Sequence, residues 1–490
     1  MSIRLFAALG LLVCLVARGD VAVAQLLAAS AAPVDWNADM RLAEAADVNP
    51  DPRIVEVHIT AKIASVEVAP GKRVDAWTYN GALPGPFIRA TVGDRLIVHF
   101  KNELEQPTTI HWHGVRVPIE MDGVPGISQA DVQPGESFTY DFVLRDASLY
   151  WYHPHVASAA QVGFGLYGAL MVDDPDDGVE IDDELTIVLS DVGFDKAGKL
   201  ESAESGGPAG MVFGREGAYL LVNGKVMPRL RVRSGALQRW RIVNTAKSRF
   251  FFLDLDGQSF TKIGSDGGLQ EASVTSEALL VTTGERVDVL VTPTGTPGSS
   301  LVVKAMLYNR GYGSVEYRAV EDLFTIEFTS EPALPKRALP TITRPITPPN
   351  GAGATPVDIV LTLPPQDASG QSEFHINGVP YWKAKPFRAR LGETQLWSIK
   401  NDSDWDHPMH LHGYFFMPVD DNSQPIRPMQ WKDTVNVPMK TTGRFLVTFD
   451  ERPGQWMFHC HILDHAEGGL MGTVVVGDVP TVEHIHKTGG

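Results

Sequence analysis

Histidine is the residue type whose distribution along this chain indicates chemistry. Of the 15 histidines, ten fall into four short clusters, one of which also contains Cys460. The clusters are His111-Trp112-His113, His153-Pro154-His155, His407-Pro408-Met409-His410-Leu411-His412, and His459-Cys460-His461 followed by His465. No histidine lies between His155 and His375. A site that uses every cluster must therefore form where an early part of the chain meets a late part.

The His-x-His spacing suits a group of metal ions if the clusters lie on strands. Residues i and i+2 of a strand point to the same face and lie roughly 6.6 Å apart, so each pair can present two imidazoles to one metal cluster. Imidazole binds copper, zinc, iron and nickel, whereas one thiolate with two imidazoles in a trigonal site is typical of blue copper. Cys460, His407 and His465 fit the second description.

The same alternation predicts a link between two sites. Cys460 faces one side of its strand while His459 and His461 face the other, so one tripeptide would join a mononuclear copper to a neighbouring cluster. Zinc also binds cysteine and histidine, but zinc gives no reason for one cysteine and ten histidines with a bridging tripeptide. The remaining histidines, which we interpret as packed or solvated, are His58, His99, His375, His484 and His486.

A repeated strand pattern would position these clusters. Tyr79-Asn80-Gly81, Val222-Asn223-Gly224 and Ile376-Asn377-Gly378 each end a strand-like run. Each is followed by an alternating stretch, a glycine and an apolar run that closes on an asparagine, namely Asn102, Asn244 or Asn401. The copies are separated by the common domain size of about 100 to 150 residues. Because the apolar period is two and no long segment sustains a period of 3.6, we expect three homologous β-sandwiches.

The expected organisation is all-β, with extended segments at the ends and before the last domain. Residues 331–356 contain seven prolines and should run extended. The leader and the tail are expected to be loosely held. The predicted segments are a signal peptide at 1–24, a leader at 25–52, domains at 53–176, 177–330 and 357–478, a Pro-rich linker at 331–356 and a tail at 479–490.

Composition and the first residues restrict the function further. The formal net charge is −17, which would repel a phosphate backbone and disfavours nucleic acid as a partner. Arg4, an apolar run and Ala22-Val23-Ala24 before Gln25 are typical of a cleaved secretory signal. That run is shorter than the about 20 residues of a membrane span. We expect a periplasmic or secreted protein without a membrane span, in which Cys460 is the single cysteine after removal of Cys14.

With these motifs in place, the sequence resembles the three-domain multicopper oxidases, the group of laccases, bilirubin oxidases and bacterial cuprous oxidases. The likeness extends from Tyr79-Asn80-Gly81 and Pro84-Gly85-Pro86 to Gly472. It implies three cupredoxin-like Greek-key β-sandwiches and four copper ions. By resemblance, type 1 copper would be held by His407, Cys460 and His465, and type 2 copper by His111 and His410. One type 3 copper would take His113, His153 and His461, and the other His155, His412 and His459.

The resemblance also indicates positions that tune the site. Leu470 occupies the position where many bacterial relatives have an axial methionine, and a noncoordinating side chain there would raise the type 1 potential; a loop shifted by one would instead bring in Met471. Asp122 matches the family acid that assists proton delivery, although it could also be a turn residue before Gly123. The second family acid is absent at Ala466, and Glu467 could substitute for it.

Three further acids have simpler interpretations. Asp402, Asp404 and Asp406 precede His407, and we interpret them as a solvated acidic loop rather than as groups that orient the imidazole or dock cationic substrates. Asp433 is interpreted as structural.

The implied function is a laccase-like enzyme that oxidises phenols or aryl amines one electron at a time and reduces O2 to water. Within the same class, the alternative is a copper-resistance oxidase that acts on cuprous ion. A noncatalytic cupredoxin-fold protein is disfavoured because the ligand set is complete. A two-domain nitrite reductase is disfavoured by the three repeats and by the pair His459 and His461.

Overall fold

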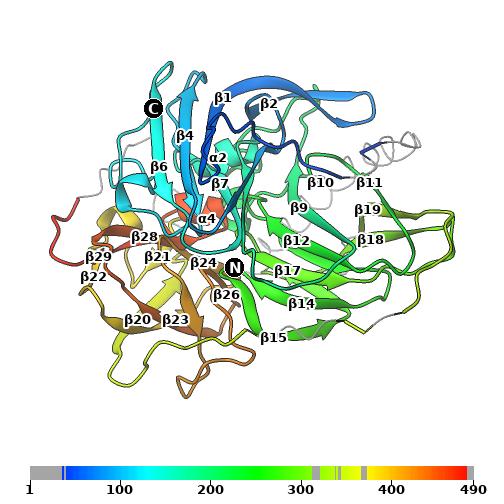
Figure 1. Cartoon of the computed structure of the whole chain (residues 1–490). Helices are drawn as coiled ribbons and strands as arrows, with labels where there is room; N and C mark the ends of the chain where they lie inside the picture. The colour runs from blue at the N-terminus through cyan, green and yellow to red at the C-terminus, as the bar shows by residue number, and fades with distance from the viewer. Residues whose placement is uncertain are drawn as a thin grey trace, which may run out of the picture.

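The computed structural model describes residues 36–37, 40–311, 320–336, 338–339, 344–365 and 372–482. The predicted signal peptide, most of the predicted tail, His484 and His486 lie outside the described residues. Six sheets are arranged as three two-layered sandwiches. Figure 1 shows the first sandwich (blue to cyan) above, the second (green) to the right and the third (yellow to red) at the lower left. The predicted all-β fold of three sandwiches is confirmed.

The first sandwich pairs a sheet of order β2-β1-β4-β6 with one of order β3-β8-β7-β5. Its elements are β1 (Ile54–Ala69), β2 (Lys72–Tyr79), β3 (Gly85–Thr91), β4 (Arg95–Asn102), β5 (His111–His113), the 3-10 helix η1 (Ile119–Met121), β6 (Ser137–Val143), β7 (Ser148–His153), α2 (Ser158–Gly163) and β8 (Gly168–Asp173). In β4 the side chains of Leu96, Val98 and Phe100 are buried and alternate with more exposed ones. This alternation fills the core of the first sandwich.

The second sandwich pairs the order β10-β9-β12-β17-β14-β15 with β11-β19-β18-β13-β16. Its elements are β9 (Asp183–Val192), α3 (Gly207–Phe213), β10 (Tyr219–Val222), β11 (Arg229–Val232), β12 (Gln238–Asn244), β13 (Phe251–Asp254), β14 (Phe260–Ser265), β15 (Gly268–Ser276), β16 (Ala278–Val281), β17 (Arg286–Val291), β18 (Ser300–Met306) and β19 (Glu321–Phe328). Every residue of β12 is buried, because this strand is also covered by the first sandwich.

The third sandwich pairs the order β21-β20-β23-β27-β25 with β22-β29-β28-β24-β26. Its elements are β20 (Thr355–Thr362), β21 (His375–Ile376), the 3-10 helix η2 (Tyr381–Lys383), β22 (Phe387–Ala389), β23 (Thr394–Asn401), β24 (His407–Leu411), β25 (Phe416–Pro418), β26 (Thr434–Val437), β27 (Thr442–Thr448), β28 (Gly454–Cys460), α4 (Leu463–Glu467) and β29 (Met471–Val476). Thr355 pairs with Gln395, so the third sandwich begins slightly before the boundary predicted at 357.

The repeated asparagines perform the same task in each sandwich. Asn80, Asn223 and Asn377 have φ of 56°, 50° and 51° and are each followed by a glycine with positive φ, as in the tight turns that Asn-Gly favours. Their side-chain oxygens accept backbone N–H groups of the neighbouring strand, from Thr60, Val188 and Val360. The repeat therefore encodes one turn that recurs three times.

The part of the leader that the structure describes is held firmly, contrary to expectation. Met40 is fully buried in the core of the second sandwich, and its carbonyl accepts a hydrogen bond from Asn223 Nδ2 at 2.6 Å. The N–H groups of Ala45 and Val48 donate to Phe87 and Glu56. The leader packs because Met40 and Ala45 supply apolar contacts that its composition did not reveal.

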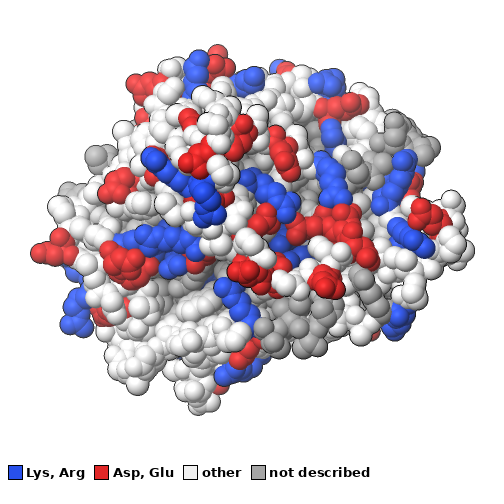
Figure 2. Space-filling model, viewed as in Figure 1, with Lys and Arg blue, Asp and Glu red and all other residues white. Residues whose placement is uncertain are grey.

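An apolar contact surface fixes how the sandwiches meet. Trp151 of β7, Val188 of β9, Val243 of β12 and Leu463 of α4 belong to one buried cluster, so residues of all three sandwiches share it. The visible surface carries acidic and basic side chains interspersed (Figure 2). Within the described ranges, no helix combines the length and hydrophobicity that a membrane crossing requires.

Candidate metal centres

Strand pairing brings the four histidine clusters together. In the first sandwich β5 pairs with β7 so that His111 lies opposite His153. In the third, β24 pairs with β28 so that His410 lies opposite His459 and Met409 opposite Cys460. Residues paired in this way have side chains on the same face of the sheet. The first and the third sandwich thus each present their clustered histidines as a compact patch.

One group of side chains contains the cysteine. The nearest atoms of His407, Cys460 and His465 lie within 4.8 Å of one another. Cys460 Sγ is 3.5 Å from His407 Nδ1 and 3.8 Å from His465 Nδ1, and the two nitrogens are 3.2 Å apart. All three side chains are fully buried. A thiolate with two imidazoles in this arrangement is the donor set of a blue copper site.

The far edge of each imidazole in this group is held by the protein. His407 Nε2 is 2.7 Å from Ser403 Oγ, and Ser403 Oγ in turn donates to Asn401. His465 Nε2–H donates to the carbonyl of Val212 in α3 at 3.0 Å. These contacts leave both Nδ1 atoms directed at Cys460, which is how outer hydrogen bonds orient metal-binding histidines.

The other eight histidines form groups on the opposite side of Cys460. Ligand atoms within 4.8 Å of one another belong to His111, His113 and His410, to His113, His153 and His461, and to His155, His412 and His459. His111, His113, His153 and His155 come from the first sandwich and the others from the third. The structure therefore places the sequence-predicted residues together at the contact between these two sandwiches.

The donor atoms of these groups suit metal ions. Buried nitrogens without a hydrogen-bond partner are His111 Nε2, His113 Nδ1, His153 Nε2, His410 Nε2 and both ring nitrogens of His461. His412 Nε2 and His459 Nε2 lie 3.1 Å apart. Buried polar atoms are normally paired, and lone pairs of neutral imidazoles converge only where a cation can separate them. The residues present thus fit several metal ions.

Outer hydrogen bonds select which nitrogen faces inward in four of these rings. The Nδ1–H groups of His111, His153 and His459 donate to the carbonyls of Asp122, Pro154 and Cys460 at 2.7, 3.0 and 2.9 Å. His412 Nδ1–H donates to Asp122 Oδ2 at 2.9 Å. Asp122, which the sequence indicated, contacts two histidines.

Burial keeps the histidines neutral and able to bind metal. Desolvation lowers the pKa of His155 and His407 to about 3. It also lowers the pKa of His113, His153, His410, His412, His459, His461 and His465. Burial alone would raise the pKa of Asp122, but the neighbouring His412 and His111 lower it. The carboxylate therefore stays charged beside the histidines.

Asp433 contributes more than its sequence interpretation suggested. Its Oδ1 accepts from His113 Nε2 at 3.2 Å, and its backbone carbonyl accepts from His410 Nδ1 at 3.0 Å. Sequence reasoning interpreted this residue as structural because no local pattern connects it to His113. The carbonyl of Val212 was missed because it reaches His465 from a segment far away in sequence. Ser403 lies only four residues before His407 and was missed because no pattern in the sequence marks it.

The three acids before His407 do not behave as one solvated loop. Asp404 and Asp402 lie near Lys440 and Lys400. Asp406, however, is buried and accepts hydrogen bonds from Tyr308 and Asn436, both at 2.9 Å. The solvated interpretation is therefore wrong for Asp406, which braces the strand that begins with His407.

The remaining candidate residues near the Cys460 site lie in the segment that follows Cys460. Leu470 is fully buried, its carbonyl accepts the N–H of Cys460 at 3.0 Å, and Met471 pairs with His459. Ala466 is buried, whereas Glu467 is exposed and its carboxylate accepts the N–H of Ala159 at 2.9 Å. In the described chain, His58, His99 and His375 join none of the metal-binding groups.

The three-sandwich fold, the group of one cysteine with two histidines and the further histidine groups define a multidomain cupredoxin-like metalloprotein. Three stretches of the chain, residues 60–177, 183–312 and 354–479, match the multicopper oxidase family, and together they cover more than half of the chain. The chain belongs to the multicopper oxidase family. It is accordingly an oxidoreductase that uses copper, oxygen and a reducing substrate.

Individual relatives are similar to this chain over most of its length. The multicopper oxidase MmcO of Mycobacterium tuberculosis is 31% identical over 464 residues, covering 85% of this chain and 86% of its own. A solved multicopper oxidase from Campylobacter jejuni, described as a metallo-oxidase, has a TM-score of 0.80 at 28% identity over 91% of this chain and 99% of its own. The laccase-like CueO of Ochrobactrum, described as active towards lignin model compounds and lignosulfonate, has a TM-score of 0.74 at 25% identity over 89% of this chain and 100% of its own.

Proposed function

We propose that this protein is a laccase-like oxidase that couples one-electron oxidation of phenols or aryl amines to four-electron reduction of O2 to water. The observation that carries the proposal is the group of Cys460, His407 and His465, which β28 joins to groups that use eight further histidines. Copper held by these residues would supply electron transfer on the Cys460 side and oxygen reduction on the histidine side.

The proposed ligand assignment follows the grouping of donor atoms. His407, Cys460 and His465 would hold type 1 copper, and His111 and His410 would hold type 2 copper. His113, His153 and His461 would hold one type 3 copper, and His155, His412 and His459 the other. Since Cys460 lies between His459 and His461 in sequence, electrons would pass from one site to the other through a single tripeptide.

Asp122 is the proposed proton-delivering group. Oxygen reduction consumes protons, so a carboxylate near the oxygen-reducing site is needed. The side chain of Asp122 is buried and contacts His412 directly. Glu467 fits the role of a second acid less well, because among the described residues its carboxylate accepts the N–H of Ala159 at the contact between α2 and α4 rather than contacting a histidine of the groups.

Leu470 is the proposed noncoordinating axial residue. Met471 pairs with His459, and paired residues share a face, so Met471 lies on the His459 side of the sheet. Alternation leaves Leu470 on the Cys460 side. An aliphatic group there would leave the copper without a soft axial donor and raise its potential.

The reductant distinguishes two candidate functions. The described activity of the Ochrobactrum protein towards lignin model compounds favours phenols. The description of the Campylobacter protein as a metallo-oxidase favours the alternative, oxidation of cuprous ion. Steady-state kinetics with a phenol, bilirubin and cuprous ion should give the highest kcat/KM for the phenol. A much higher value for cuprous ion would establish the alternative.

Elemental analysis tests the site itself. We expect about four copper ions per chain and an intense blue absorption from the Cys460 thiolate. One copper per chain, or zinc alone, would refute the proposed cluster.

The proposed location is the periplasm or the extracellular medium, supported by the signal-like pattern of residues 1–24. N-terminal sequencing of the exported protein should begin near Gln25. An intact Met1 on the active protein would contradict this proposal.

A further inference from the structure

The second sandwich supplies none of the proposed ligands, yet it reaches the histidine groups. Gly284, which precedes β17, has φ +81°, and a Cβ atom at this position would lie 2.8 Å from His461 and 3.1 Å from His113. The main chain of the second sandwich therefore lies so close to the rings of His461 and His113 that only a glycine fits at this position. Arg286, two positions further on, adds a polar contact between the second sandwich and Asp433.

Asp433 and Thr434 form a cradle for two imidazoles from different sandwiches. His113 Nε2 lies 3.2 Å from both Asp433 Oδ1 and Thr434 Oγ1. His410 Nδ1 lies 3.0 Å from the Asp433 carbonyl and 3.2 Å from Thr434 Oγ1. The cradle holds one edge of each ring, which leaves His113 Nδ1 and His410 Nε2 as the unpartnered nitrogens. It thus selects the donor atoms of both residues.

Arg286 holds the side chain of this cradle. Its Nη1 donates to Asp433 Oδ1 at 2.7 Å, and its Nη2 donates to Asp433 Oδ2. The other N–H groups donate to the carbonyls of Leu149, Gly284 and Asp266 at 3.1, 3.0 and 3.2 Å. All five guanidinium hydrogens are thereby used. Holding both carboxylate oxygens of Asp433 together with three carbonyls requires a planar guanidinium, and the single ammonium group of a lysine could not reproduce these contacts.

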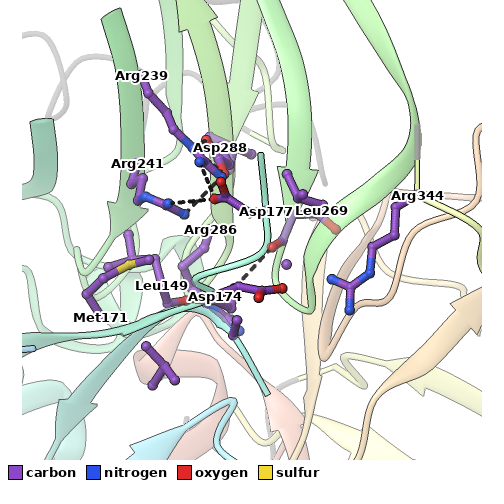
Figure 3. A pocket seen from close by; sticks show the side chains of 16 residues that line it. Leu149, Met171, Asp174, Asp177, Arg239, Arg241, Leu269, Arg286, Asp288 and Arg344 are labelled. Atoms are coloured by element: carbon purple, nitrogen blue, oxygen red, sulfur yellow. Dashed lines mark hydrogen bonds and ion pairs between the residues drawn. The ribbon is translucent and has the colours of Figure 1, made fainter. Parts of the chain in front are cut away.

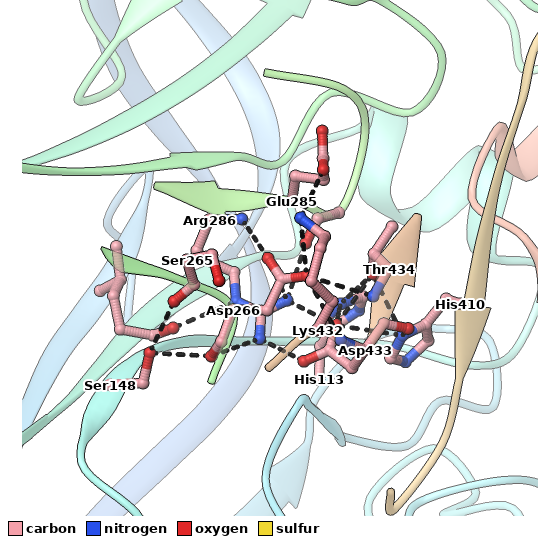
Figure 4. Close-up of polar contacts among 12 residues, drawn as sticks. His113, Ser148, Ser265, Asp266, Glu285, Arg286, His410, Lys432, Asp433 and Thr434 are labelled. Carbon is pink, nitrogen blue, oxygen red and sulfur yellow. Dashed lines mark hydrogen bonds and ion pairs between the residues drawn. The ribbon is translucent and has the colours of Figure 1, made fainter. Parts of the chain in front are cut away.

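Asp266 holds the main chain of the same cradle. Its Oδ2 accepts the backbone N–H groups of Asp433 and Thr434 at 3.3 and 3.2 Å, and its Oδ1 accepts the backbone N–H of Arg286 at 2.9 Å. Lys432 Nζ lies 3.2 Å from Asp266 Oδ2. Figure 4 shows Asp266 and Arg286 converging on Asp433 next to His113 and His410.

We infer that Arg286 and Asp266 are positioning residues through which the second sandwich sets copper binding at the histidines His113 and His410. This inference rests on the proposed copper assignment. Residues that hydrogen-bond metal-binding histidines directly change metal affinity by about 10- to 100-fold when removed. Arg286 and Asp266 act one step further out, through Asp433 and Thr434, so we expect the lower end of that range. Rigid placement of Asp433 matters here because one residue orients a type 2 and a type 3 ligand together.

The test replaces Arg286 by Met, which keeps a long side chain and removes the fork, and by Lys, which keeps the charge. The copper-loaded proteins are dialysed against graded concentrations of a copper chelator. Copper per chain, the type 2 electron paramagnetic resonance spectrum and the blue absorption are measured at each step. We expect both variants to lose type 2 copper at about one tenth of the chelator concentration that the unmodified protein requires. The type 2 hyperfine splitting should also change, whereas the blue absorption should not.

Arg239→Met is the matched control. Arg239 also lies in the second sandwich, is 2% exposed and donates to Asp288 and Asp177 (Figure 3). None of its hydrogen bonds reaches a histidine among the described residues. Its loss removes a buried arginine fork of the same kind without touching the cradle, so type 2 copper should be retained.

The outcomes are separable. A normal type 2 spectrum and normal chelator resistance in Arg286→Lys would overturn the inference, as would equal copper loss in Arg239→Met. Arg286→Lys also decides the matter if Arg286→Met does not fold. Absence of a type 2 signal from the unmodified protein would instead refute the copper assignment.

Discussion

At the scale of single residues, Cys460 connects the two halves of the proposed chemistry. Its thiol lies with His407 and His465, while the residues on either side of it belong to the histidine groups. Burial raises the pKa of the Cys460 thiol, so the free side chain is a neutral thiol. A metal ion must displace its proton, because thiolate is the form that binds metal.

Replacing Cys460 by Ser should separate the two sites. We expect loss of the blue absorption and of phenol oxidation, while about three coppers remain bound by the histidines. Visible spectra and elemental analysis measure both effects. Normal phenol oxidation by this variant would show that electrons enter by another path.

Leu470 and Met471 decide the potential of the Cys460 site. If Leu470 is axial, Leu470→Met should add a thioether ligand and lower the potential. A drop of about 59 mV changes the one-electron equilibrium tenfold, so poorly reducing phenols should be oxidised more slowly. Redox titration of this variant and of Met471→Leu gives the answer. A large response at Met471 with none at Leu470 would mean that Met471 is the axial residue.

At the scale of elements, α3 is the segment of the second sandwich that contacts His465. This short helix of the second sandwich covers the outer edge of the imidazole through the Val212 carbonyl, and the Phe213 ring lies 5.8 Å from that of Trp405. Gly206 and Gly214 flank the helix with φ of 72° at both. We expect donor molecules to approach the Cys460 site past this helix.

Replacing Gly207–Phe213 by a shorter Gly-Ser segment should open that approach. Bulky phenols should gain several-fold in kcat/KM, while ferrocyanide, a small outer-sphere donor, should change little. In the copper-free protein, Cys460 should react faster with a thiol reagent, because it is the single cysteine after the predicted signal peptide. Arg215, which pairs with Asp464, is retained in the variant. Unchanged reactivity of Cys460 would show that α3 does not limit access.

At the scale of the whole molecule, the proposed coppers join the first and third sandwiches. A ligand bound only by the folded state stabilises it by about 4 kcal/mol at a thousandfold excess over its Kd. Copper removal should therefore lower Tm by several degrees, on the order of 2 to 4 °C per kcal/mol for domains of this size. Calorimetry of the copper-free and reloaded protein measures this change. Equal Tm values would mean that the histidine groups are stable without metal.

The chemistry of the site and the repeated architecture could be predicted from local patterns along the chain. Four His-x-His clusters and one cysteine need only local alternation to be interpreted, and the recurring Asn-Gly turns need only local backbone preference. The family and the all-β fold followed from these patterns. Asp122 could also be recognised, because it matches the family acid that follows the first His-Trp-His motif.

The groups that hold the histidines in place could be identified only from the three-dimensional fold. Val212, Asp433, Arg286 and Asp266 act between segments or sandwiches that are far apart in sequence, and no periodic pattern records such contacts. Ser403 lies only four residues before His407, but no pattern in the sequence shows that its hydroxyl turns toward that imidazole. The buried position of Asp406 and the packing of Met40 were misjudged for the same reason. Burial and hydrogen-bond partners depend on what lies opposite a residue in space, and that is settled only when the three sandwiches meet.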